Sequence, residues 1–326
     1  MNELKQRILT ENKEDLSEIE IQLSENLKPY LDLVSEVAHH ILFAGGKRLR
    51  PLLLVLSARL CGYKDKYAKT VSSALEYLHA ATLLHDDIID DAVLRRGKKV
   101  AHSLYGNAIT VLVGDFLLAR ALTICADSGK IKVIHIISQL TEHMSTGEVH
   151  QLMRKGDVTL TEDEYLEVIR RKTAVLFQAA CTVSAVIADA PEKKENALSE
   201  YGYNLGIAFQ MVDDLFDYTM DTADLGKEVG ADLREGKLTL PIIHALKQAD
   251  SAEHDQMVKI IQNEDFTVDE FKALVQLLEK NDGIAYTIAK ATSYIEKAKD
   301  ALSVFEASKI RDTLLDIADY TLARRI

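Results

Sequence analysis

Apolar residues recur along most of the chain with the three- and four-residue spacing of one face of an α-helix. No run shows the two-residue alternation that is typical of a half-buried strand. The spacing predicts helices over residues 1–44 with a break at Pro29, 52–60, 66–91, 107–126 and 130–154. Further helices are expected to begin at the capping boxes Thr161-x-x-Glu164 and Thr267-x-x-Glu270, and near Pro191 and Pro241. We therefore predict an all-α protein, one domain over residues 1–326, with a helical bundle around a central cavity.

Two of these apolar helices carry the same acidic pattern, Asp-Asp-x-x-Asp. The copies comprise Asp86, Asp87 and Asp90, and Asp213, Asp214 and Asp217. Side chains four residues apart share one face of a helix, so the first and last aspartate of each copy point the same way. Two negative charges ~4 Å apart repel by roughly 4 kcal/mol at an effective dielectric near 20. Such motifs therefore need a positive partner.

Carboxylate oxygens suit Mg²⁺, which binds through a few carboxylates together with water and substrate phosphates. We expect the two motifs to face each other and to hold Mg²⁺ ions that grip a diphosphate. A solvated helix face would explain a single motif equally well, but it explains two copies in apolar helices poorly. The pair His85-Asp86 also resembles the metal-binding pair of HD phosphohydrolases, although that function gives the second motif no role.

Composition and charge narrow the class of partner. The 326 residues include 39 Lys and Arg against 51 Asp and Glu, so the net charge of −12 argues against a nucleic-acid partner. Three widely spaced cysteines, Cys61, Cys125 and Cys181, favour reduced thiols in a cytoplasmic protein. The first twenty residues are too polar for a signal peptide, and we expect no transmembrane segment because no apolar run reaches about 18 residues.

Basic residues gather near the acidic motifs. They form four clusters: Lys47, Arg48 and Arg50; Arg95 and Arg96; Lys172; and Lys227 and Lys237. One basic dipeptide is usually a solvated surface, but four clusters indicate room for two phosphorylated ligands, one held through Mg²⁺ and one directly. The apolar segments before both motifs predict a cavity for a hydrocarbon tail, in which an allylic diphosphate could ionise away from water. The residues alone indicate only that the protein is a Mg²⁺-dependent enzyme acting on a phosphorylated apolar substrate.

Several motifs in fixed order extend this interpretation. They are Gly45-Gly46-Lys47-Arg48-Leu49-Arg50-Pro51, Leu84-His85-Asp86-Asp87-Ile88-Ile89-Asp90, Arg95-Arg96-Gly97, Gly114-Asp115, Gly147-Glu148, Lys172-Thr173, Phe209-Gln210, Asp213-Asp214-Leu215-Phe216-Asp217 and Gly226-Lys227. With them the chain resembles the trans-type prenyl diphosphate synthases over almost its whole length. The resemblance implies an isoprenoid-synthase fold, usually a homodimer, and condensation of isopentenyl diphosphate with an allylic diphosphate.

The resemblance also assigns roles to residues. Isopentenyl diphosphate would be bound by Lys47, Arg50, His79 and Arg96. The allylic diphosphate would be contacted by Arg95, Lys172, Thr173, Gln210, Lys227 and Lys237, with Lys237 the least secure because the preceding loop varies in length. All six motif aspartates would hold Mg²⁺, and Asp86, Asp90, Asp213, Asp217 and Lys172 would be catalytic. In the family, ionisation precedes attack of the isopentenyl double bond, and the leaving diphosphate removes the proton.

Product length is set in this family by bulky residues before the first motif. Ala81 and Thr82 stand where short-chain enzymes often carry an aromatic residue, and each added C5 unit gains roughly 4 kcal/mol by burial. We therefore expect a long chain, around octaprenyl, for a quinone side chain. Tyr77 or a residue of the 130–151 helix could instead block the tunnel. The alternatives are a C15 or C20 synthase, a subunit of a heteromeric synthase and, less favoured, a terpene cyclase.

Overall fold

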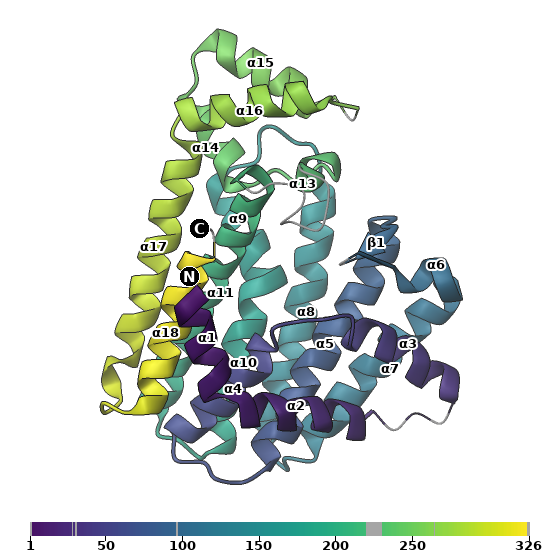
Figure 1. Ribbon diagram of the computed structural model, residues 1–326, viewed down its shortest axis with the longest axis vertical. Coiled ribbons are helices and arrows are strands. Elements are labelled where there is room, and N and C mark those ends of the chain that lie inside the picture. Colours follow the sequence, from purple (N-terminus) through teal and green to yellow (C-terminus); the bar gives the residue numbers. More distant parts are fainter. Residues whose placement is uncertain are drawn as a thin grey trace.

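A computed structural model describes residues 2–27, 29, 31–95, 97–219, 230–263 and 265–324. Nearly every element in these ranges is a helix, which confirms the predicted all-α class (Figure 1). The first half comprises α1 (Asn2–Glu11), α2 (Lys13–Glu25), α3 (Asp32–Leu42), α4 (Leu49–Leu60), α5 (Tyr67–Ile89), β1 (Leu94–Arg95), β2 (Lys98–Lys99), α6 (Ala101–Tyr105), α7 (Asn107–Ala126) and α8 (Ile131–Met153).

The second half begins with a short helix that continues through a π-helical turn. Its elements are α9 (Glu162–Ile169), η1 (Arg170–Ala174), α10 (Val175–Ile187), α11 (Glu192–Thr219), α13 (Ala231–Arg234), α14 (Leu240–Gln248), α15 (Ser251–Ile261), α16 (Val268–Lys280), α17 (Gly283–Ala301), η2 (Leu302–Val304) and α18 (Lys309–Ala323). In Figure 1, α15 and α16 lie across one end of the molecule, and the terminal helices α1 and α18 pack against each other, with α18 also packing against α11.

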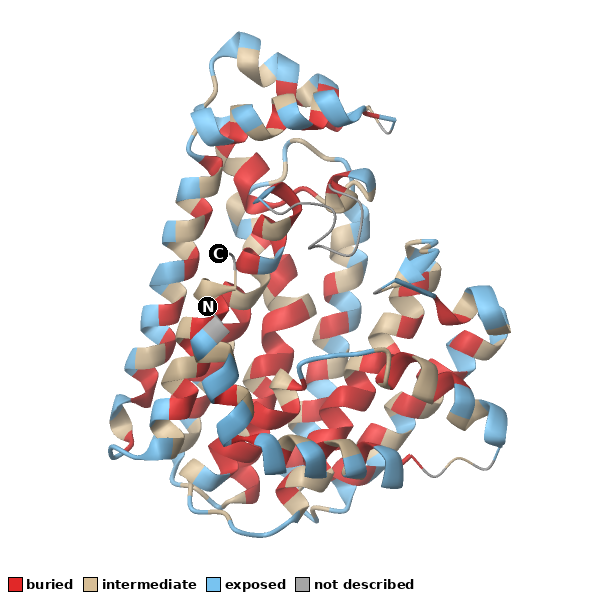
Figure 2. Ribbon diagram, in the orientation of Figure 1, coloured by how far each residue is buried: buried red, intermediate tan, exposed pale blue. Residues whose placement is uncertain are grey.

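The core is built around α5, α10 and α11. Helix α10 packs against α4, α8 and α11 and is buried over most of its length, so its sequence is apolar on nearly all sides. Figure 2 shows the buried residues concentrated in these central helices, whereas the outer faces of α15, α16 and α17 are largely exposed. Both acidic motifs therefore stand at the ends of long, well-packed helices, α5 and α11.

Local signals in the sequence located several helix ends correctly. Both predicted capping boxes form, with Thr161 paired to Glu164 and Thr267 paired to Glu270. Helix α7 spans the predicted residues 107–126, and α14 begins with Pro241 in its first turn. These signals act within one turn of the chain, which is why the sequence alone reveals them.

Three local expectations were wrong. Residues 1–44 break at Asn12 as well as near Pro29, and the Asn12 amide donates to the Ile8 carbonyl at 2.7 Å, a local bond that competes with the helix. A two-residue antiparallel ladder joins β1 to β2, where no strand was predicted. The turn at 170–174 is π-helical rather than α-helical.

Helix α7 differs from the expectation that no segment is long and apolar enough to cross a membrane. It meets that criterion by length and composition, and 39% of its most apolar window is buried inside the bundle. One face packs against α5 and α8. The other leaves Val111 and Leu112 exposed. An apolar surface of this kind in a bundle is typical of a contact with another protein surface.

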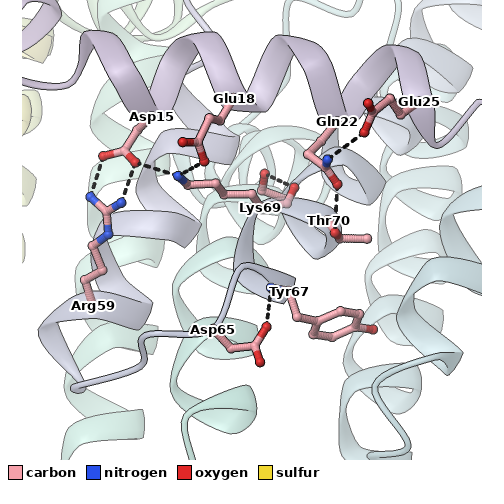
Figure 3. Close-up of polar contacts among 10 residues, drawn as sticks. Asp15, Glu18, Gln22, Glu25, Arg59, Asp65, Tyr67, Lys69 and Thr70 are labelled. Atoms are coloured by element: carbon pink, nitrogen blue, oxygen red, sulfur yellow. Dashed lines mark hydrogen bonds and ion pairs between the residues drawn. The ribbon is translucent and has the colours of Figure 1, made fainter.

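Helix α2 lies across α4 and α5 and is held there by polar contacts (Figure 3). Asp15 accepts two hydrogen bonds of 2.5 Å from the Arg59 guanidinium on α4. Gln22 accepts a hydrogen bond of 2.9 Å from Thr70 on α5. These contacts hold the N-terminal helices on the bundle.

Candidate functional site

A cavity of about 850 Å³ opens between α1, α4, α5, α8, α10, α11 and α18. The wall includes nine of the residues predicted for the site: Lys47, Arg50, His79, Thr82, Asp86, Lys172, Thr173, Gln210 and Asp213. Apolar side chains, among them Ala80, Leu83, Met144 and Leu176, line other parts of the wall. One aspartate of each acidic motif therefore borders the same space, as predicted for opposed motifs.

A second cavity of about 260 Å³ adjoins the first. Its wall includes Arg95, Lys172, Thr173, Gln210, Asp213, Asp214 and Lys237. Lys172, Thr173, Gln210 and Asp213 line both cavities. Of the residues predicted for the two diphosphates, those that the structure describes thus border two neighbouring spaces with a shared wall.

The aspartates of the first motif have different surroundings. Burial raises the pKa of Asp86 to about 6, and the nearby Lys172 opposes that rise. Asp87 is buried and accepts hydrogen bonds from Arg95, with distances of 2.8 Å from Nε and 2.6 Å from Nη2. Asp90 pairs with Lys237 at 3.0 Å. Two of the basic residues predicted for the allylic diphosphate, Arg95 and Lys237, therefore contact the first motif directly.

The aspartates of the second motif also differ from one another in burial and in their partners. Asp213 is half-exposed and pairs with Arg324 of the chain's C-terminal end at 3.2 Å. Asp214 accepts hydrogen bonds from the Tyr165 hydroxyl at 2.6 Å and the Gln210 amide at 2.7 Å, and burial raises its pKa to about 7. Asp217 is fully buried and accepts a hydrogen bond from the backbone N–H of Asp232 at 3.1 Å.

The six aspartates do not form a ready-made metal cage. Among the described residues, no group of three or more His, Cys, Asp or Glu side chains is placed to hold a metal ion. The motif side chains that border the cavities, Asp86, Asp213 and Asp214, are nevertheless carboxylates, the ligand type that Mg²⁺ prefers, and Mg²⁺ usually takes only one or two of them alongside substrate phosphates. The residues present therefore fit Mg²⁺ held jointly by the protein and a diphosphate.

Lys47 and Arg50 border the large cavity, each against an aromatic ring. The Lys47 ammonium donates to the Tyr320 hydroxyl at 3.0 Å, and burial together with the nearby Arg324 lowers its pKa to about 8. The Arg50 guanidinium lies 4.8 Å from the ring centroid of Phe177. Both cations therefore stand at the cavity wall, where ammonium and guanidinium groups can donate to the oxygens of an anion.

Lys172 and Thr173 lie in the π-helical turn η1. A Cβ atom at Gly147 of α8 would lie 2.7 Å from the Cβ of Arg171 and 3.0 Å from the backbone nitrogen of Lys172. Only glycine therefore lets α8 approach the turn this closely. Lys172 pairs with Glu148 and donates to Gln151 at 2.8 Å, and Thr173 donates to Gln210 at 2.7 Å. Single π-helical turns within α-helices occur frequently at functional sites.

The residues proposed to limit product length are placed differently from one another. Thr82 lies on the wall of the large cavity. Ala81 and Tyr77 are buried away from that wall, and the Tyr77 hydroxyl donates to the Leu23 carbonyl at 2.6 Å. Of the remaining site residues, Arg96 and Lys227 lie outside the described part of the chain.

Sequence reasoning missed several residues of the site. Arg324 has its guanidinium 4.2 Å from the Phe209 ring centroid and pairs with Asp213, and Tyr320 contacts Lys47. Both belong to the C-terminal end of the chain, where no motif marks them; the adjacent pair Arg324-Arg325 was the only signal. Tyr165, the partner of Asp214, looked like an ordinary core residue.

Comparisons with known proteins agree on one family. The family model "Polyprenyl synthetase" matches residues 31–278. Octaprenyl diphosphate synthase of Escherichia coli is 36% identical over 311 residues, which cover 95% of this chain and 96% of that protein. A polyprenyl synthase of Caulobacter crescentus, solved with calcium and isoprenyl diphosphate, superposes with a TM-score of 0.93 at 38% identity, covering 99% and 98% of the two chains. Geranylgeranyl pyrophosphate synthetase of Pyrococcus horikoshii gives 0.89 at 33% identity, covering 98% of each chain.

Proposed function

The chain belongs to the polyprenyl synthetase family and is a prenyltransferase, and on this premise we propose that it elongates an allylic diphosphate with isopentenyl diphosphate to a long chain, around octaprenyl. One observation carries the proposal: two cavities, each with its own cationic residues, share the wall formed by Lys172, Thr173, Gln210 and Asp213. Two diphosphates bound in these cavities would lie side by side, as a condensation between them requires.

In the proposed reaction, Arg95, Lys172 and Lys237 bind the allylic diphosphate and stabilise the charge that develops as its C–O bond breaks. Lys47, Arg50 and His79 hold isopentenyl diphosphate so that its double bond faces the allylic carbon, and a new C–C bond forms there. The proton lost from the isopentenyl unit passes to the departed diphosphate. Apolar residues such as Leu83 and Leu176 exclude water from the cation.

The family uses a divalent metal, and we propose Mg²⁺. Asp86 and Asp213 border the large cavity and would hold the metal together with the remaining aspartates of both motifs. When bound, Mg²⁺ neutralises the diphosphate and makes it a better leaving group. The cations that pair with Asp87, Asp90 and Asp213 offset carboxylate repulsion within the protein itself.

The long product is supported by the size of the cavity and by its lining. About 850 Å³ bordered by Ala80, Leu83, Met144 and Leu176 offers an apolar path for a growing tail. Since Thr82 borders this space and Ala81 does not, Thr82→Tyr should shorten the product more than Ala81→Tyr. Equal product lengths in wild type and Thr82→Tyr would mean that the tail follows another route.

A C20 product is the second candidate, and the similarity to the Pyrococcus protein favours it. The long-chain and C20 proposals are distinguished by one assay. The purified chain alone is incubated with Mg²⁺, farnesyl diphosphate and radiolabelled isopentenyl diphosphate, and the dephosphorylated products are analysed by chromatography. A ladder ending near octaprenol supports the long-chain proposal, and a single C20 product refutes it. A protein that is inert until a second protein is added would instead be one subunit of a heteromeric synthase.

We further propose that the chain is a cytoplasmic homodimer in which a second copy covers α7. Leu112 is 66% exposed and Val111 40% exposed on the side of α7 that faces away from the bundle. Exposed apolar residues on a long helix favour burial against a partner surface. Light scattering should give twice the chain mass for the wild type and a smaller mass for Leu112→Glu. An unchanged mass for Leu112→Glu would place the interface elsewhere.

A further inference from the structure

Arg48 lies between the two proposed isopentenyl diphosphate ligands Lys47 and Arg50, yet its surroundings are different. Its backbone φ is 47°, in the left-handed region that residues other than glycine rarely adopt. Its side chain is buried, although a charged side chain is normally buried only when it is paired. A strained backbone and a buried guanidinium together indicate that surrounding contacts hold this residue in place.

The Arg48 guanidinium contacts three helices. Nε donates to Glu20 of α2 at 2.6 Å, Nη1 donates to Glu76 of α5 at 3.4 Å, and Nη2 donates to the Leu42 carbonyl at 2.7 Å. The Leu42 carbonyl belongs to the last turn of α3, where carbonyls lack helical partners. Because Arg48 bonds back to Leu42, its side chain closes the loop that carries Lys47.

The charges around Arg48 argue against a direct role in binding the substrate. Glu20 and Glu76 already neutralise the guanidinium, and Glu76 itself borders the large cavity. A diphosphate placed at Arg48 would therefore meet a carboxylate. Arg48 lies over the Phe43 ring at 5.7 Å, just as Lys47 and Arg50 lie over aromatic rings, so its two carboxylate partners are the feature that argues against such a role.

Glu76 also connects this contact set to the other side of the proposed site. It precedes His79 by three residues on α5, so both side chains lie on the same face of the helix, and both border the large cavity. We propose that Arg48, held by Glu20 and Glu76, is the positioning residue of the isopentenyl diphosphate site. It fixes the loop after α3 against α5, so that Lys47 and Arg50 stand opposite His79. This inference rests on the proposed binding roles of those three residues.

The test compares binding of the two substrates. Isopentenyl diphosphate binding is measured by calorimetry, and KM is measured separately for isopentenyl and farnesyl diphosphates. Arg48→Lys keeps the charge but loses the fork-shaped donor set. It should weaken isopentenyl diphosphate binding about tenfold or more, because hydrogen bonds from Arg48 to its charged partners are lost. KM for farnesyl diphosphate should stay within about twofold of wild type.

Glu76→Gln distinguishes positioning from simple electrostatics. Removing a negative charge from the cavity wall would by itself tighten binding of an anion. The positioning role predicts weaker binding instead, because Arg48 loses a charged partner. Arg59→Lys is the matched control, since Arg59 forms a comparable pair with Asp15 between α2 and α4 away from both cavities (Figure 3). It should change neither KM.

The outcomes separate this inference from the proposed function. Lys47→Ala is measured in the same calorimetric assay. If Lys47→Ala binds isopentenyl diphosphate as tightly as wild type, the proposed substrate site is wrong. If Lys47→Ala weakens binding while Arg48→Lys binds normally, or Glu76→Gln binds more tightly, the positioning role of Arg48 is refuted. Circular dichroism of each variant identifies any loss of helical structure.

Discussion

The contact between His85 and Gly114 offers a quantitative test of how α7 positions the first acidic motif. His85 directly precedes Asp86, and its Nε2 lies 3.1 Å from the Val111 carbonyl of α7. A Cβ atom added at Gly114 would lie 2.2 Å from that same Nε2. Gly114→Ala should therefore displace the His85 ring and break the contact with Val111.

The change in stability follows from two destabilising contributions and one stabilising contribution. Overpacking costs about 1–3 kcal/mol, and the lost hydrogen bond costs about 0.5–1.5 kcal/mol. Alanine in a helix interior gains about 0.5–1 kcal/mol over glycine. Gly114→Ala should thus destabilise the wild type by about 0.5–4 kcal/mol. Without the His85 ring, the same substitution should stabilise the protein by about 0.5–1 kcal/mol.

The assay is a double-mutant cycle on wild type, Gly114→Ala, His85→Ala and the double variant, with thermal unfolding followed by circular dichroism. Gly114→Ala should lower the melting temperature of wild type and raise that of His85→Ala. His135→Ala, which removes a histidine from the exposed face of α8, is the control background, and there Gly114→Ala should destabilise as in wild type. An equal effect of Gly114→Ala in all backgrounds would show that the glycine is not required by His85.

Three further predictions concern charge and packing. Burial raises the pKa of Asp86 from 3.8 to about 6, so without metal the folded state binds one more proton than the unfolded state between these pH values. The protein therefore loses stability as pH rises from about 4 to about 6. In the presence of a chelator, Asp86→Asn should raise the melting temperature at pH 7 but not near pH 4, and equal shifts at both pH values would contradict this. Burial and then Arg324 lower the pKa of Lys47 to about 8, so KM for isopentenyl diphosphate should rise above that pH, and Lys47→Arg should flatten the profile. Gly147→Ala should displace the turn that carries Lys172, and KM should rise more for the allylic substrate than for isopentenyl diphosphate. Equal changes in both KM values would argue against a local effect.

Local signals explain why much of the fold could be predicted. The capping boxes at Thr161 and Thr267 involve residues within one turn, so the sequence contains all the information they need. Periodicity located α7 to the residue, because its apolar stretch is bounded on the N-terminal side by Gly106. The pairing of α5 with α11 at one cavity followed from the repeated acidic motif and the resemblance.

Features that depend on tertiary contacts were not predictable. The π-helical turn at 170–174 lies beside Gly147 of α8, a contact between residues far apart in sequence. Arg324 reaches Asp213 across 111 positions, and the sequence near either residue does not indicate that these two pair. Ala81 is expected to line the tunnel from its distance to Asp86, whereas the residue that borders the large cavity is Thr82 and Ala81 is buried. Helix rotation is set by packing, which the spacing of one motif does not determine.

The central claim is that both acidic motifs hold a divalent metal together with the allylic diphosphate. The most direct measurement is a crystal structure with Mn²⁺ and an unreactive thio-analogue of farnesyl diphosphate, using the anomalous signal of manganese. The account predicts manganese peaks bridging the diphosphate to Asp86 of α5 and to Asp213 of α11. Diphosphate bound with manganese at neither motif, or at one motif alone, would contradict it.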